Sequence, residues 1–283
     1  MTWHMVEKYG QPSPVECLRE LLGEAAVNLC ALSVDAELPD LQKTDGAIHC
    51  LSRVAALSYL LRSGWPKTTY RAFRDPLLEH LNDLDRVRAA RIIEVTLGEH
   101  APEDWELSLA LPKASSWLDA ALPDLLDGLM TPPGNEAVAT ALSTLASHCL
   151  EAGTWLDADG PSPSGARLAK LLRQGRRMQV SLELLSSGLS EEWQTLRPVL
   201  VAWVDCLERW TQVRRVVRTV GQSGSKKSRA RLRRSERRLA AQTLAATAAL
   251  QLQPRGPLVI DWFEVVQDCL GRHERVETRT QGN

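Results

Sequence analysis

The sequence predicts an all-α protein: an irregular multi-helix bundle of about eight to ten helices, or alternatively a short α-solenoid of helix pairs. The composition is the first observation behind this prediction. Isoleucine occurs four times, tyrosine three times and phenylalanine twice in 283 residues, whereas the helix formers leucine, alanine, arginine and glutamate dominate. In addition, apolar residues recur at intervals of three and four, which is the spacing of one helix face. These apolar stretches end at glycine or proline, as helices commonly do.

The solenoid alternative comes from Trp117, Trp155 and Trp193, which are each 38 residues apart, with W-L-D-A at the first two. The three windows do not align beyond those letters. A solenoid needs several similar stacked repeats, so the bundle is favoured.

Long and short helices are expected throughout the N-terminal half. Three long helices are predicted over 13–32, 44–61 and 76–97. Asp75 is expected to cap the third, because proline fits the first turn of a helix and an aspartate before it can bond the free N–H groups. Between 105 and 129, Pro112 and Pro123 predict only short helices. A further helix should begin at Asn135 and end near Ala152.

Glycine, proline, serine and aspartate follow one another through 154–166, which predicts a linker. The linker would divide an acidic N-terminal helical region, 1–153, from a C-terminal helical region, 167–283. In the latter we expect helices over 166–187 and 196–220, then a basic helix from Ser225 and a last helix from Asp261 to about Gly271. Thr195 is the expected cap of the second of these helices, and Gly221 and Gly224 its end.

A stripe along the 196–220 helix predicts that it is a core element. Its members are Leu200, Trp203, Leu207, Trp210 and Val217. Burial of two tryptophans on one stripe is the expected arrangement; exposed tryptophans would instead indicate contacts with a partner.

Charge is distributed unevenly along the chain. Residues 1–153 hold twelve bases and twenty-two acids, whereas 213–238 holds eleven bases and one acid, Glu236, although the whole chain has a net charge of −1. Such a density suits the neutralisation of phosphates. The candidate binding residues for a nucleic acid or another anionic partner are Arg214, Arg215, Arg218, Lys226, Lys227, Arg229, Arg231, Arg233, Arg234, Arg237 and Arg238. Leu232 and Leu239 would leave only a narrow apolar seam on this helix.

These features favour a non-enzymatic helical interaction protein, such as a subunit of a larger assembly, whose basic segment contacts nucleic acid backbone or an acidic protein. No base-reading motif accompanies the segment, so binding should have little sequence preference. Two alternatives stay open. The basic segment could be purely structural, docked on the acidic N-terminal half, or the chain could be an enzyme with scattered acid and base residues.

No cofactor or metal site is expected. The segment 221–228 resembles a phosphate-binding loop but lacks the required G-K-[S/T] tripeptide and its spacing. The pairs His49–Cys50 and His148–Cys149 are adjacent on helices and so point about 100° apart, which makes each a poor pair of metal ligands. Residues 157–160 resemble the start of a calcium loop without its later ligands.

The N-terminus shows no signal-peptide pattern, and no stretch has eighteen uninterrupted apolar residues. We therefore expect a cytoplasmic protein without a membrane span, whose six cysteines stay reduced. The excess of arginine over lysine favours a bacterial source with a GC-rich genome.

Overall fold

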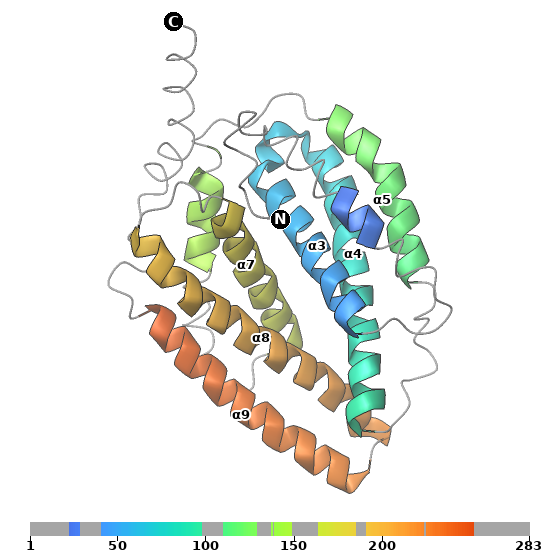
Figure 1. The fold of residues 1–283 in the computed structure, drawn as a ribbon, viewed down its shortest axis with the longest axis vertical. Coiled ribbons are helices and arrows are strands. Elements are labelled where there is room, and N and C mark those ends of the chain that lie inside the picture. The colour runs from blue at the N-terminus through green and yellow to red at the C-terminus, as the bar shows by residue number, and fades with distance from the viewer. Residues whose placement is uncertain are drawn as a thin grey trace, which may run out of the picture.

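The computed structural model describes residues 23–28, 41–97, 110–128, 137, 139–148, 164–184, 191–223 and 225–251. These residues are helical almost throughout and contain no strand, which confirms the predicted all-α, multi-helix fold (Figure 1). No helix in this part of the chain is both long enough and apolar enough to cross a membrane.

Six α-helices and two short helical segments have defined bounds. They are α3 (Leu41–Leu60), the 3-10 turn η2 (Arg62–Gly64), α4 (Lys67–Ile92), the π-helical turn η3 (Ile93–Leu97), α5 (Ala110–Asp127), α7 (Gly165–Leu184), α8 (Glu191–Ser223) and α9 (Lys226–Gln251). Residues 23–28 and 139–148 are also helical. Residues 13–22 and 29–32 of the first expected helix, the helix expected over 261–271, the cap at Asn135 and most of the linker lie outside the described residues.

The cap predicted at Asp75 is wrong, because α4 begins at Lys67, nine residues before the predicted start at 76, and runs through Pro76. The carboxylate of Asp75 accepts hydrogen bonds from Nε and Nη2 of Arg74, at 2.8 and 2.6 Å. Phe73 and Leu77 are buried on either side of the proline. Their burial offsets the roughly 3 kcal/mol that an interior proline costs a helix.

Two further helix boundaries differ from the prediction, again because burial of neighbouring residues offsets the cost of a proline inside the helix. Helix α5 is 18 residues long and contains Pro123, where only short helices were expected. Helix α8 begins at Glu191 and not after Thr195, so that Pro198 lies inside it, and it continues past Gly221. In both helices buried leucines lie close to the proline, so packing against neighbouring helices determines where the helix ends.

Serines cap two of the helices that carry the candidate sites. Oγ of Ser164 accepts a hydrogen bond from the backbone N–H of Arg167 at 3.2 Å, at the start of α7. Oγ of Ser225 accepts one from the N–H of Ser228 at 3.1 Å, at the start of α9. These bonds satisfy donors that have no partner within the helix.

The core consists of two large clusters and a small one. One large cluster joins α3, α4 and α5, and the other joins α7, α8, α9 and the helix at 139–148. The third cluster connects the ends of α4 and α8 through Ile93 and Val216. Helices α8 and α9 form an antiparallel hairpin along one side of the molecule (Figure 1).

The structure confirms that α8 is a core helix. Leu200, Trp203, Leu207 and Trp210 are all at most 1% exposed. Val217 is only partly buried, because the stripe continues through its neighbour Val216.

Candidate functional site

The eleven candidate binding residues lie on the α8–α9 hairpin and divide into an inward-facing and an outward-facing set. Arg214 and Arg215 face inward. Nη1 of Arg214 lies 3.3 Å from a carboxylate oxygen of Glu236, the only acid of the basic segment. Nη2 of Arg215 donates to Asn82 of α4 at 3.2 Å, and its Nη1 lies 3.8 Å from Asp85.

Arg218 lies at the boundary between the two sets. It is exposed, but its guanidinium covers the start of α7, since a Cβ added to Gly165 would lie 2.6 Å from Nη1 of Arg218.

The outward set occupies the first half of α9, and we call it the α9 basic face. All eight members are exposed: Lys226, Lys227, Arg229, Arg231, Arg233, Arg234, Arg237 and Arg238. None forms an ion pair with a described carboxylate. The face therefore presents to solvent eight positive charges that no described carboxylate neutralises.

A narrow stripe on the opposite side of α9 holds this helix against α8. Leu232 is partly buried against the small cluster at the ends of α4 and α8, and Leu239 is buried in the large cluster of the C-terminal helices. Glu236 lies on the same side and bonds Arg214 of α8. The apolar seam expected from the sequence thus fixes α9 so that its arginines point outward.

An ion-pair network connects α3 and α4 to α7 and α8. Arg88 bonds Asp45 at 2.7 Å and also pairs with Glu208, while Arg176 lies 2.9 Å from the second oxygen of Glu208. Burial alone would raise the pKa of Glu208, but the two arginines outweigh it and hold this pKa below its usual value. These groups are committed to one another, which is typical of a structural network and not of free catalytic acids and bases.

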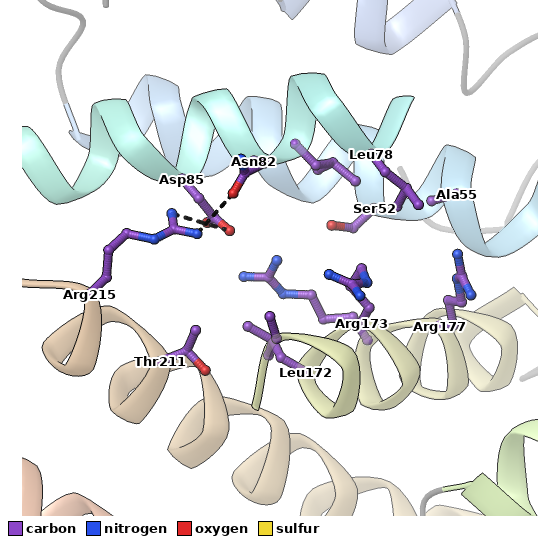
Figure 2. A pocket seen from close by; sticks show the side chains of 13 residues that line it. Ser52, Ala55, Leu78, Asn82, Asp85, Leu172, Arg173, Arg177, Thr211 and Arg215 are labelled. Atoms are coloured by element: carbon purple, nitrogen blue, oxygen red, sulfur yellow. Dashed lines mark hydrogen bonds and ion pairs between the residues drawn. The ribbon is translucent and has the colours of Figure 1, made fainter. Parts of the chain in front are cut away.

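Next to this network is a cleft that sequence reasoning missed, between α3 and α4 on one side and α7 and α8 on the other (Figure 2). Its cavity volume is about 60 Å³. Four arginines line it, Arg173, Arg176, Arg177 and Arg215, together with one acid, Asp85. The sequence did hold a signal, since positions 173, 176 and 177 share one helix face. Their position opposite α4 depends on the tertiary fold.

The segments that resemble a phosphate-binding loop or a metal site in the sequence do not have the structure of such sites where they are described. Residues 221–223 continue α8 as helix, so the segment 221–228 does not form a phosphate-binding loop there. His49 is exposed while Cys50 is buried and accepts a hydrogen bond from Asn28 at 3.1 Å, so these two side chains point apart. Within the described ranges no three histidine, cysteine or acidic residues gather as metal ligands would.

Comparison with known proteins assigns no family to this chain, because no protein-family model, no curated protein and no solved structure matches it.

Proposed function

We propose that the chain binds the phosphate backbone of nucleic acid through the α9 basic face, with little preference for sequence. The observation that carries the proposal is the exposure of all eight lysines and arginines between positions 226 and 238, with no described carboxylate to neutralise them. Groups of this kind bind phosphates and release the counterions condensed on the polymer.

The structure also bears on the competing idea that the segment is docked on the acidic N-terminal region. That arrangement holds for Arg215, which contacts Asn82 and Asp85 of α4. It does not hold for the α9 basic face, whose members contact no described acid of that region. A few arginines of the hairpin therefore contact the rest of the protein, whereas the eight residues of the α9 basic face are accessible to a partner.

An anionic polymer fits this face better than a protein does. Protein interfaces are usually centred on buried aromatic or aliphatic anchors. The large hydrophobic residues that are exposed in the described ranges are Val27 and Val95, and neither is on α9. Charge without an apolar centre is typical of contacts to a phosphate backbone.

The test compares two variants that each remove two exposed charges four residues apart on one helix. Arg229→Gln with Arg233→Gln alters the α9 basic face, and Lys67→Gln with Arg71→Gln is the matched control at the start of α4. Binding of labelled duplex DNA is measured against salt concentration. We expect the first variant to bind more weakly and to reduce the steepness of the salt dependence by up to about 1.8, or about 0.9 for each phosphate that is no longer neutralised.

The control variant should bind like the wild type, and both should melt normally because exposed charges contribute little to stability. Two DNA sequences of equal length should bind equally well. Absence of wild-type binding at low salt would refute the proposal, as would equal weakening by the control variant.

A further inference from the structure

We propose that the cleft between α3, α4, α7 and α8 is a specific binding site for a phosphate group, held by Arg173 and Arg177. This site is separate from the α9 basic face and does not depend on the proposed function. The ligand would be inorganic phosphate or the phosphate of a small monoester.

The first argument is the imbalance of charge around the cleft. Four arginines line the cleft, Arg173, Arg176, Arg177 and Arg215, together with one carboxylate, Asp85. Arg176 is paired with Glu208 and Arg215 with Asp85, whereas Arg173 and Arg177 form no ion pair with a described carboxylate. Two positive charges remain, and a phosphate dianion carries the charge that would balance them.

Arg177 shows this imbalance most clearly. Its guanidinium carbon lies 4.9 Å from the centre of the Tyr59 ring, and that of Arg62 lies 4.0 Å from the same ring. The titratable groups that influence Arg177 are Tyr70 and Tyr59, which raise its pKa, and Arg173 and Arg74, which lower it, with no carboxylate among them. Burial lowers the pKa of Arg177, as expected for a buried cation without a carboxylate partner. Buried charges are normally paired, so the missing partner would come from solution.

Arg215 lies at the other end of the cleft (Figure 2), where Asp85 partly compensates its charge. Its Nη2 donates to Asn82 at 3.2 Å, but its Nη1 is buried without a hydrogen-bond partner and lies 3.8 Å from Asp85. A hydrogen bond between ionised groups is usually 2.7–2.9 Å long. In Figure 2, Arg215 extends from α8 to Asn82 and Asp85 of α4 at one end of the cleft, and Arg177 of α7 lies at the other end. Arg173 and Arg177, which are one helical turn apart on α7, are therefore the arginines that would share one phosphate.

The size of the cleft limits what can bind. A volume of about 60 Å³ has room for about four water molecules, which suits a tetrahedral oxyanion. Leu78, Leu81 and Leu172 form apolar walls, so the arginines act in a partly dry environment where charge interactions are stronger. Arg173 is exposed, and the ligand can enter past it.

The test is a calorimetric titration of the full chain with inorganic phosphate at constant ionic strength, using chloride as the balancing anion. We expect saturable binding of one phosphate per chain. Replacing Arg173 and Arg177 with methionine, which keeps the packing of the side-chain stems, should weaken binding at least about tenfold, since each charged hydrogen bond is worth a tenfold factor or more. Methyl phosphate, a minimal monoester, is the second probe, and tighter binding of this probe would identify a monoester as the ligand.

A second measurement makes the result independent of folding defects. Because the two charges are uncompensated in the free protein, the Arg173→Met, Arg177→Met variant should melt at the same temperature as phosphate-free wild type or at a higher one. Phosphate should raise the melting temperature of the wild type but not of this variant. The Arg229→Gln, Arg233→Gln variant should still bind phosphate, which separates the cleft from the α9 basic face.

Three outcomes would overturn the proposal. One is an absence of saturable binding by the wild type. Another is unchanged binding by the methionine variant. The third is a clear loss of stability in the phosphate-free variant, because it would mean that the two arginines already have stabilising partners.

Discussion

Two helical glycines provide a test of how closely α7 packs against α8. A Cβ added to Gly175 would lie 2.8 Å from Cζ3 of Trp203 and 3.1 Å from Cγ2 of Val204, and the Trp203 side chain is completely buried. A Cβ added to Gly46 of α3 would meet nothing within 4 Å. The same substitution, glycine to alanine, should therefore have opposite effects at the two positions.

The expected magnitudes follow from this geometry. In both helices alanine gains about 0.5–1 kcal/mol over glycine, because it loses less conformational freedom on folding. At Gly175 the new methyl group must displace a buried indole ring, and such overpacking costs about 1–3 kcal/mol. We expect Gly46→Ala to stabilise the protein and Gly175→Ala to destabilise it by about 1–2 kcal/mol. The gap between the two variants measures the overpacking, since the helix-propensity gain cancels.

Urea unfolding followed by far-ultraviolet circular dichroism gives both values. Adding Trp203→Phe to Gly175→Ala should relieve part of the clash, so the double variant should lose less stability than the sum of the single changes. If both alanine variants were equally stabilising, α7 would not pack against Trp203 as described, and the assignment of α8 to the core would need revision.

Three further perturbations test other parts of the fold. Trp203→Ala should cost about 3–5 kcal/mol and lower the Tm by roughly 6 °C or more in a thermal melt, because it removes a fully buried side chain. Glu208→Gln should cost about 2–3 kcal/mol in urea unfolding, since it leaves the partly buried Arg88 and Arg176 poorly compensated. Burial lowers the pKa of His80, whose ring lies 5.0 Å from that of Trp117, so the unfolded chain binds protons more readily there. Stability should therefore fall as the pH drops below about 6.5, and His80→Gln should flatten the pH dependence of unfolding between pH 7 and 5.

The positions of the helices were largely predictable from local patterns, but their boundaries were not. The apolar stripe of α8 correctly identified its buried tryptophans. Proline and capping signals misplaced the starts of α4 and α8, at Asp75 and Thr195. A local signal of this kind is worth about 1–3 kcal/mol, and burial of a few leucines in a packed core exceeds it.

The candidate sites, like the helix boundaries, could be predicted from the sequence only in part. The density of lysine and arginine in 213–238 is visible in the sequence, and so is the narrow seam at Leu232 and Leu239. Which arginines face inward is not visible, because Arg215 meets Asp85, and Arg88 meets Glu208, across more than a hundred residues of chain. The arginine-lined cleft depends on four helices and could not have been assembled from spacing alone.

Sequence patterns alone predicted that this chain is all-α, that α8 lies in a core, and that positive charge is concentrated in the segment 213–238, which holds eleven bases and one acid. Composition, apolar periodicity and charge density are properties of neighbouring residues, so they are present before the chain folds. The extent of each helix, the charges that are neutralised internally and the two arginines without a described counter-ion became visible only in the folded chain. Those outcomes depend on burial and on contacts between distant helices, and no local pattern carries that information.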